Sequence, residues 1–296
     1  MKRLARASAL LVVIATLSGC GSTGNVKGTA SRATPLLEEI TAAHHNGFDR
    51  IVFRFAGALP SERRVGYVRE LIADPSGRPI SIAGQAVLRV RMYPAAAHTD
   101  TGHITAPGQL AFATPNLISV VRSGDFEAVL SYGIAVAKRS SVHMFTLKQP
   151  SRVVIDVSAP FRTVQKRVYF FNQRNFLANR QPFFSAVLRP VLPSTPASGL
   201  MDRLFAGPTA TERARGLRLL RSKATGYRSL AVSAGLARVR LTGGCSSGGS
   251  TVSIADEIFP TLKQLPGVRH VKLLDPSGHT ATPVGDVDSR PFCLEP

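Results

Sequence analysis

Apolar and polar residues alternate along the first half of the chain. The clearest run covers residues 51–56, where Ile, Phe and Phe take every second position, and Ala86–Tyr93 repeats the pattern. Shorter runs follow at Asn116–Val121, Phe126–Ala137, Val142–Leu147 and Arg152–Val157, with turn residues between them. A period of two over short segments is typical of half-buried strands. Because no amphipathic helix interrupts the runs, the pattern predicts an antiparallel β-sandwich.

The second half of the chain mixes both periodicities. Strands are expected at Arg167–Asn172, Ala186–Leu192, Tyr227–Ser233, Leu236–Leu241 and Val268–Leu274. Three helices are expected: from an N-cap at Ser198 to Phe205, from Thr209 or Thr211 to Leu217, and from an N-cap at Ser253 to Leu265. Strands mixed with helices indicate a layered fold. The predicted fold class is therefore α+β overall, a β-sandwich followed by a mixed α+β domain, with the boundary near residues 159–165.

The first twenty residues have the composition of an export signal. Basic residues precede an apolar stretch, Ala7–Leu17, and small residues lead to Cys20. The run Leu17-Ser18-Gly19-Cys20 resembles the lipobox of bacterial lipoproteins. This resemblance implies that residues 1–19 are removed and that Cys20 is diacylated at sulfur, which gives a stable membrane anchor. A transmembrane anchor is not expected, because an apolar stretch of about 11 residues is too short to span a membrane. The remaining alternative is an ordinary cleaved signal in which Cys20 has no role.

A small, polar and glycine-rich stretch follows Cys20 as far as Pro35. Such a composition predicts a flexible tether, while Leu36–Ala43 is expected to form a short helix or an extended lead-in. These patterns divide the chain into a signal peptide at 1–19, a tether at 20–43, a first domain at 44–159 and a second at 166–296.

The chain is strongly basic, with a formal net charge of +19. Loss of Lys2, Arg3 and Arg6 with the signal lowers the charge to about +16, and the other basic residues are scattered arginines. For an exported protein the available polyanions are lipid headgroups and anionic wall polymers, so nucleic acid is not an expected partner. The alternative is a solvated surface without a binding role.

Two cysteines, Cys245 and Cys293, are left once Cys20 is assigned to the lipid. Outside the cytoplasm disulfides persist, and a bridge here would close a loop of about 48 residues, worth about 4 kcal/mol by chain entropy. The alternatives are two free thiols or a metal pair. The lack of a CxxC arrangement favours the disulfide.

No motif in the sequence provides a complete catalytic or cofactor site. Residues 19–24 match GxGxxG literally, but they lie at the cleavage site without a strand before them or a helix after them. His98, Asp100 and His103 share one loop and form the one metal candidate of the sequence, and the alternative is that they are exposed loop residues without a ligand role. We therefore expect no cofactor, no metal and no enzymatic activity.

Three further groups of residues could suggest chemistry. Ser246-Ser247 lies in a glycine-rich loop, but no base accompanies it in the sequence. Glu38-Glu39 is expected in a helix near the tether, and Asp256-Glu257 fits the first turn of a helix, where acids are favoured. Paired carboxylates of glycan hydrolases need a defined separation in space, which the sequence does not fix.

Several features of residues 167–279 belong together: Val168-Tyr169-Phe170, the segment Leu204-Phe205-Ala206-Gly207-Pro208-Thr209 with Glu212, and the late helix with Thr261-Leu262. With these features the segment resembles the GerMN domain of spore-germination proteins and of actinobacterial envelope lipoproteins. Residues 44–158 resemble the AMIN-like domain, through the pieces at 47–53 and 150–157. The resemblance implies envelope targeting for the first domain and a non-catalytic interaction module for the second. The glycine-rich insert at 243–249 departs from the GerMN pattern.

These observations lead to one expected function and two alternatives. We expect a lipid-anchored protein on the extracytoplasmic face of the cell membrane, which binds cell-wall or other envelope components without catalysis. The first alternative is a protein-interaction scaffold for an envelope sensor or assembly system. The second, which the sequence favours least, is a cell-wall glycan hydrolase.

Overall fold

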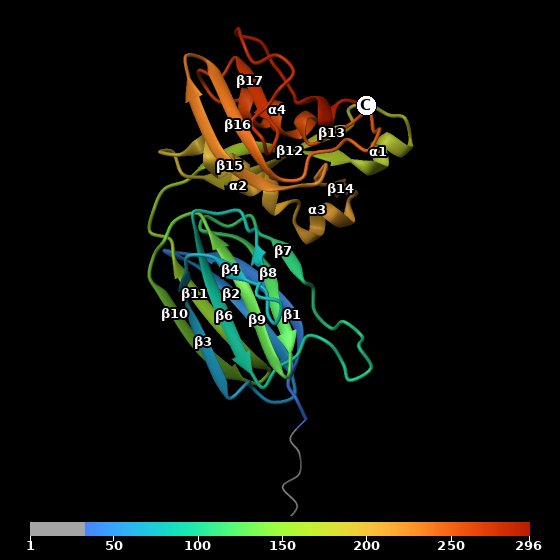
Figure 1. Cartoon of the computed structure of the whole chain (residues 1–296). Helices are drawn as coiled ribbons and strands as arrows, with labels where there is room; N and C mark the ends of the chain where they lie inside the picture. Colours follow the sequence, from blue (N-terminus) through green and yellow to red (C-terminus); the bar gives the residue numbers. More distant parts are fainter. Residues whose placement is uncertain (1–32) are drawn as a thin grey trace, which may run out of the picture. The chain divides into compact units, whose positions relative to one another are not determined.

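The computed structural model describes residues 33–296, so the signal peptide, Cys20 and most of the tether lie outside the described residues. Strands β1 to β11 form the N-terminal domain (Figure 1). Their bounds are β1 Leu36–His45, β2 Phe48–Ala56, β3 Glu62–Val68, β4 Leu71–Ile72, β5 Pro79–Ile80, β6 Ala86–Tyr93, β7 Gln109–Ala111, β8 Leu117–Phe126, β9 Val129–Val136, β10 Val142–Lys148 and β11 Ser151–Ser158.

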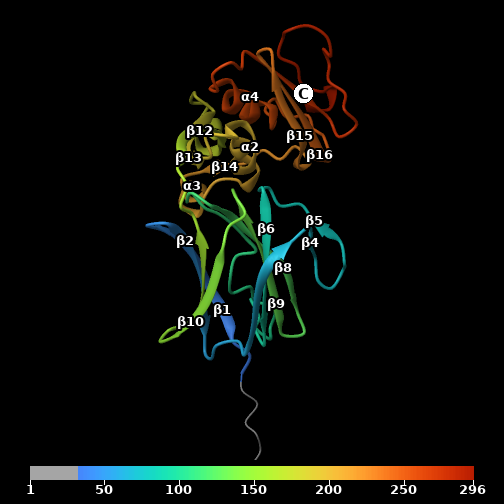
Figure 2. The same cartoon turned by 90° about the vertical axis from the view of Figure 1, so that its left-hand side faces the viewer.

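Two antiparallel sheets make up this domain, in the orders β1-β2-β11-β10 and β3-β6-β9-β8-β7. Ile51 and Phe53 of β2 are fully buried and pack in one core cluster with Leu88 of β6 and Tyr132 of β9. Figure 2 shows β1, β2 and β10 on one side of the domain and β6, β8 and β9 on the other. The predicted antiparallel β-sandwich is confirmed, because alternate residues of each strand fill the space between the sheets.

Strand β1 corrects the predicted extent of the tether. Residues 36–45 pair with β2 along its whole length, from Leu36 opposite Ala56 to His45 opposite Phe48. Leu37 is fully buried in the core of the sandwich. The segment 36–43 is therefore part of the first domain, and Glu38-Glu39 lies on a strand instead of the expected helix.

The outer faces of the two sheets differ. A short hairpin of β4 and β5 covers part of the five-stranded sheet, and Leu71 of this hairpin lies against Gly133 of β9. A Cβ atom at position 133 would lie 2.3 Å from Leu71 Cδ2, so the close approach requires glycine there. Asp74 of the same hairpin accepts hydrogen bonds from Arg89 and Ser131 on that face.

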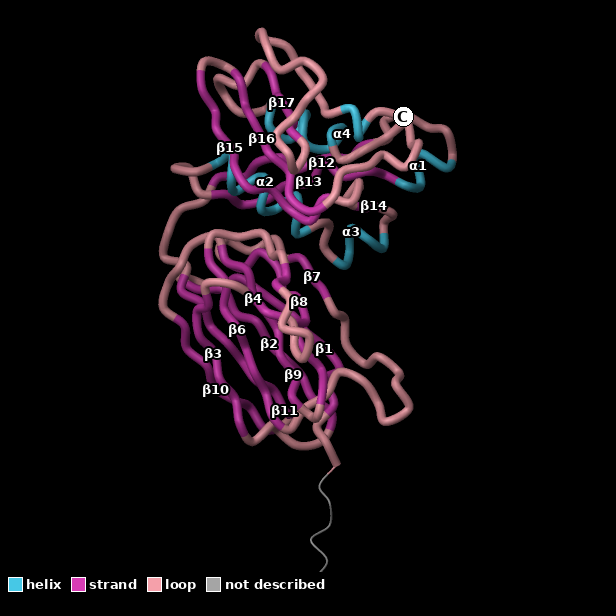
Figure 3. Tube along the Cα trace, in the orientation of Figure 1, coloured by secondary structure: helices cyan, strands magenta, loops and turns pink. Residues whose placement is uncertain are grey.

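The C-terminal domain contains the remaining elements (Figure 3). They are β12 Val164–Asn172, α1 Gln173–Leu177, β13 Phe184–Val191, α2 Pro196–Ala206, α3 Ala210–Ala214, β14 Leu217–Arg218, β15 Ala224–Ser233, β16 Leu236–Gly243, α4 Ala255–Lys263, β17 His270–Leu274 and the 3-10 helix η1 Phe292–Leu294. Two three-stranded sheets, β13-β12-β14 and β15-β16-β17, pack with α2 and α4 around one core. The predicted α+β class is confirmed.

Local chemistry explains where the helices begin. Of the two expected starts of helix α3, Thr209 is the N-cap, and it forms a capping box with Glu212 in which each side chain is bonded to the backbone of the other residue. The helix ends at Ala214 instead of the expected Leu217, which lies in β14. Helix α2 begins at Pro196, two residues before the expected cap at Ser198, because proline fits the first turn of a helix. The expected cap at Ser253 is also wrong: its backbone N–H donates to Asp256 Oδ2, 2.8 Å away, and its hydroxyl caps nothing.

Helix α1 is absent from the sequence-based assignment because it is only five residues long. Its N-cap, Asn172, accepts a hydrogen bond from the Asn175 N–H. Within residues 33–296, no helix is both long and apolar enough to cross a membrane.

Candidate functional site

The residues singled out in the sequence are placed in separate parts of the fold. Cys20 lies outside the described residues. Cys245 and Cys293 form a disulfide, with Cα atoms 5.7 Å apart, which ties the C-terminal segment to the end of β16. Ser247 Oγ donates to the carbonyl of Glu295, and Ser246 Oγ accepts from Gly248 N–H. Both hydroxyls therefore hold the loop, and neither has a carboxylate or histidine partner among residues 33–296.

The loop with His98 and His103 does not assemble a metal site. His98 Nδ1 lies 2.9 Å from Asp125 Oδ2, and Asp125 also accepts from Ala97 N–H and Arg122. The described part of the chain contains no group of three or more His, Cys, Asp or Glu side chains suited to an ion.

Glu257 is the most strongly perturbed carboxyl group of the C-terminal domain. It is fully buried, and burial raises its pKa well above the ordinary value. Its two oxygens accept hydrogen bonds from the backbone N–H groups of Phe171 and Leu220, at 2.9 and 3.1 Å. Glu257 faces backbone donors instead of a cleft, so its role is structural.

Two further side chains of helix α4 accept hydrogen bonds from backbone N–H groups of strand β12, as Glu257 does. Thr261 Oγ1 accepts from Tyr169 N–H, and Gln264 Oε1 accepts from Arg167 N–H. Residues 257, 261 and 264 lie on one face of the helix, while the N–H groups of 167, 169 and 171 lie on one edge of the strand. The helix therefore supplies acceptors to a strand edge that would otherwise be buried without partners.

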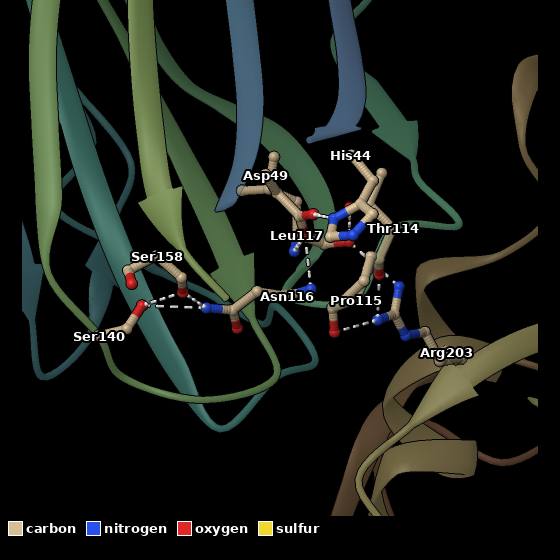
Figure 4. Close-up of polar contacts among 9 residues, drawn as sticks. All are labelled: His44, Asp49, Thr114, Pro115, Asn116, Leu117, Ser140, Ser158 and Arg203. Carbon is tan, nitrogen blue, oxygen red and sulfur yellow. Dashed lines mark hydrogen bonds and ion pairs between the residues drawn. The ribbon is translucent and has the colours of Figure 1, made fainter. Parts of the chain in front are cut away.

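A second buried network joins the two domains (Figure 4). Arg203 of α2 is fully buried and donates to four carbonyls of the loop between β7 and β8 in the N-terminal domain. These carbonyls belong to Phe112, Thr114, Pro115 and Leu117, at 2.7–3.1 Å. Burial, together with the charge of nearby Arg189, lowers the pKa of Arg203 to about 9.

Asp49 of β2 holds the same loop from the other side. Its Oδ2 accepts from the N–H groups of Asn116 and Leu117, and its Oδ1 lies 2.7 Å from His44 Nδ1. Figure 4 shows the loop between Asp49 and Arg203, with the Asn116 amide bonded to Ser140 and Ser158. The Asp49 carboxylate thus binds N–H groups of this segment, and the Arg203 guanidinium binds its carbonyl groups. Through Arg203 the C-terminal domain is attached to the segment.

Asp202, beside Arg203, makes a further contact across the junction. Its carboxylate accepts from Gln85 Nε2 of the N-terminal domain and from the Tyr227 hydroxyl, at 2.7 and 2.8 Å. Burial raises the pKa of Asp202, although both hydrogen bonds act in the opposite direction. Asp49, Asp202 and Glu257 all accept hydrogen bonds from protein donors, and this arrangement is typical of structural groups.

The open side of the four-stranded sheet carries the best candidate for a binding surface. Register places five outward residues from β1, β2 and β10 on one face of the sheet, and we call this group the stacking face: His45, Phe48, Arg50, Phe145 and His143. The His45 ring stacks on Phe48 with centroids 4.9 Å apart, and His143 stacks on Phe145 at 5.4 Å. The Arg50 guanidinium lies 5.2 Å from the centroids of both Phe48 and Phe145.

An ion pair fixes the centre of the stacking face. Arg50 Nε and Nη2 donate to the two oxygens of Asp156, at 2.7 and 2.8 Å. This bidentate geometry holds the guanidinium plane, and the pair raises the pKa of Arg50. The result is a cluster of aromatic rings with charged and polar groups beside them, a surface chemistry suited to sugars, which combine C–H faces with hydroxyl edges.

The sequence gives only a weak signal for the stacking face. Phe48 and Phe145 are 97 positions apart, and each occupies an outward position of a strand whose inward residues are apolar. Only the pairing of β2 with β11 and of β11 with β10 brings them to one face. In the sequence, the signal for this surface is an aromatic residue, Phe48 or Phe145, at an outward position of a predicted strand.

Family models match both halves of the chain. The AMIN-like domain model matches residues 35–159, and the model for sporulation and spore germination, the GerMN domain, matches residues 167–275. The chain is an AMIN-like domain followed by a GerMN domain. The AMIN-like match begins at residue 35, in agreement with the position of β1. Both are non-catalytic, binding-type modules with envelope or sporulation roles.

One solved structure is similar to part of the chain, the tandem GerMN domains of the sporulation protein GerM from Bacillus subtilis. Sequence identity is 18%, the TM-score is 0.30, and the match covers 46% of this chain and 48% of that one. The chain thus matches about half of that protein's length. No curated protein matches the chain.

Proposed function

We propose that the protein is an envelope-binding module whose stacking face holds a glycan polymer of the cell wall. The observation that carries this proposal is the group His45, Phe48, Arg50, Phe145 and His143 on an open sheet face. The AMIN-like and GerMN matches support a binding role without catalysis. Wall glycan is a polymer of sugars, whose C–H faces and hydroxyl groups match an aromatic cluster with polar neighbours.

We also propose that Cys20 carries the membrane anchor. The support is the sequence around it, in which Leu17-Ser18-Gly19 precedes the cysteine after a basic and then apolar start. Replacement Cys20→Ser should move the protein from the membrane fraction to the soluble fraction, because the acyl chains supply most of the membrane affinity. Membrane retention of Cys20→Ser would contradict the anchor.

Sedimentation of the full chain with purified cell wall tests the stacking face. Phe145→Ala should weaken binding about tenfold, since an aromatic contact is worth about 0.5–1.5 kcal/mol beyond its buried area. Tyr93→Ala is the matched control: Tyr93 is 40% exposed on β6 of the same domain but belongs to the other sheet. Equal losses for the two variants, or no loss for Phe145→Ala, would contradict the proposal.

A second candidate function, a protein-interaction scaffold, is favoured by a groove at the junction. The groove has a volume of about 560 Å³, and its lining includes residues 38–42 of β1, 107 and 110–114 near β7, and 209–211 at the start of α3. Strand β1 is the edge of its sheet, so its backbone can pair with an added extended peptide. Thr41→Pro would block that pairing and leave the stacking face intact, which separates the two functions.

The wall-glycan hydrolase alternative gains no support from the buried carboxylates. Asp49, Asp202 and Glu257 each accept hydrogen bonds from fixed protein donors. Glu38 and Glu39 both pair with Arg54 on the open face of the sheet. Asp256 pairs with Arg290, 3.2 Å away.

A further inference from the structure

The excess positive charge of the protein is concentrated in the GerMN domain. Residues 160–296 contain 19 Lys and Arg against 8 Asp and Glu, a net charge of +11. Residues 33–159 contain 13 against 10, a net charge of +3. A surface that attracts anions is therefore expected on the second domain, away from the stacking face.

Five exposed or half-buried arginines lie on α1, α3 and β14 or within three residues of their ends. They are Arg174, Arg180, Arg213, Arg215 and Arg218. The three elements lie next to one another in Figure 1, and the Gln173 N–H at the start of α1 donates to the carbonyl of Gly216. Together with Phe176 and Leu177 of α1, these arginines are called the α1 lobe.

Backbone carbonyls hold the guanidinium groups in place. Arg174 donates to the Ala214 carbonyl at 2.7 Å, and its side chain packs against Gly216, where an added Cβ would lie 2.6 Å from Arg174 Cγ. Arg218 donates to the carbonyl of Arg213, also at 2.7 Å. Each guanidinium has five N–H donors, so most of them are left for a ligand.

Carboxylates do not neutralise this cluster. Glu212, the nearest acid in sequence, is bound by Arg189 and by Thr209 N–H. Burial raises the pKa of Glu212, but the bonds and charge of Arg189 together with the bonds of Thr209 lower it below the ordinary value. Among the described residues, none of the five arginines of the α1 lobe forms an ion pair. Burial and the neighbouring charge of Arg218 lower the pKa of Arg213, as expected for like charges held together.

An apolar tip lies beside these charges. Leu177 at the end of α1 is 77% exposed and Phe176 is 37% exposed. The Phe176 ring packs on Phe171 and Phe183, with centroids 5.2 and 5.3 Å apart. These ring contacts hold Phe176 in place. Leu177 follows it directly and projects into solvent within one helical turn of Arg174.

We propose that the α1 lobe docks on a membrane surface rich in anionic phospholipid. The bilayer interface presents phosphate groups directly above hydrocarbon, and this combination matches cations around an exposed leucine. A soluble polyanion would match the arginines but would gain nothing from Leu177. This inference is independent of the proposed glycan contact, because the two surfaces lie on different domains.

Hydrogen exchange of the full-length protein tests the α1 lobe. The protein is mixed with vesicles of phosphatidylcholine alone or of phosphatidylcholine with phosphatidylglycerol. Amides of residues 173–183 should exchange more slowly only with the anionic vesicles. Leu177→Ser should reduce this protection about tenfold, since burial of a leucine side chain is lost. Arg215→Gln should reduce it about fivefold, the contribution of one basic residue at an anionic surface.

Matched variants control for charge and exposure. Val284→Ser replaces another exposed apolar residue, 79% accessible, and Arg238→Gln replaces an exposed arginine of β16. Both should leave the protection unchanged. Equal protection in both kinds of vesicle, or the same loss with control variants, would overturn the proposal. Protection of 173–183 by soluble polyphosphate but not by anionic vesicles would also overturn it and would indicate a polymer site.

Discussion

Two groups of arginines, one in each domain, are held in opposite ways. In the AMIN-like domain, Arg50, Arg54 and Arg89 are paired with carboxylates on the sheet faces. In the GerMN domain, Arg174, Arg213 and Arg218 of the α1 lobe bind backbone carbonyls and no acid. The overall net charge of +19 therefore does not indicate how the arginines of the stacking face and of the α1 lobe are paired. A paired arginine stiffens a face for stacking, whereas an unpaired cluster leaves charge available for an anionic partner.

The junction between the domains decides whether they act separately. Arg203 and Asp49 bind the loop 112–117 from opposite sides, and neither charge makes an ion pair with the other. We expect the domains to unfold together as long as this network is intact. The following predictions start with the change that should separate the domains most.

Replacement of Arg203 should have the largest effect. Arg203→Met removes a buried guanidinium that satisfies four carbonyls, and should lower the free energy of unfolding by about 3 kcal/mol or more. Urea unfolding should then show two transitions, one for each domain. Arg213→Met is the control, because Arg213 donates to the single carbonyl of Pro208 and its loss should cost about 1 kcal/mol. Similar losses for both variants would refute the role of Arg203.

Removal of the disulfide should weaken the GerMN domain alone. Cys245 and Cys293 are 48 residues apart, so Cys245→Ala with Cys293→Ala should cost about 4 kcal/mol by chain entropy. In the Arg203→Met background only the transition of the GerMN domain should move. A shift of the AMIN-like transition would show that the domains are still coupled.

Two buried carboxylates should respond differently to amide replacement. Glu257→Gln places an NH₂ group against a backbone N–H of Phe171 or Leu220, neither of which can turn, and should cost about 1–3 kcal/mol. Asp202→Asn should cost less than about 1 kcal/mol, because the Gln85 amide can reverse and accept instead. Thermal unfolding of the two variants compares them directly, and equal costs would contradict this account.

The raised pKa of Glu257 also sets a pH dependence. Because the folded state holds this proton more tightly than the unfolded state, stability should fall as pH rises above the ordinary value of 4.5 towards the folded pKa. Glu257→Gln should flatten this part of the stability curve. An unchanged slope in the variant would assign the dependence to another group.

Salt should have the smallest effect on the stacking face and a larger one on the α1 lobe. Aromatic stacking is insensitive to ionic strength, while the attraction of exposed arginines to anionic lipid is screened within about 10 Å at 0.1 M salt. Binding to cell wall should therefore survive salt that releases residues 173–183 from anionic vesicles. If wall binding weakens with salt as much as vesicle binding does, the binding would be attributed to dispersed arginines instead of the stacking face.

The sequence by itself determined most of the strands and helices and their order, although it missed β1 and α1. Alternation of Ile51, Phe53 and Phe55 requires a strand with one buried face, and Thr209 with Glu212 fixes the start of α3, because these effects act between near neighbours. The resemblance to both domain families also rests on such local motifs.

Only the tertiary structure decided which distant residues meet. Leu36–Ala43 joins the sheet because β2 offers it a partner edge, which the composition of the segment does not reveal. Phe48 and Phe145 share a face through two strand pairings, and Arg203 is buried because loop 112–117 presents four carbonyls to it. Such contacts depend on register and docking between segments far apart in sequence, and a local pattern contains no information about either.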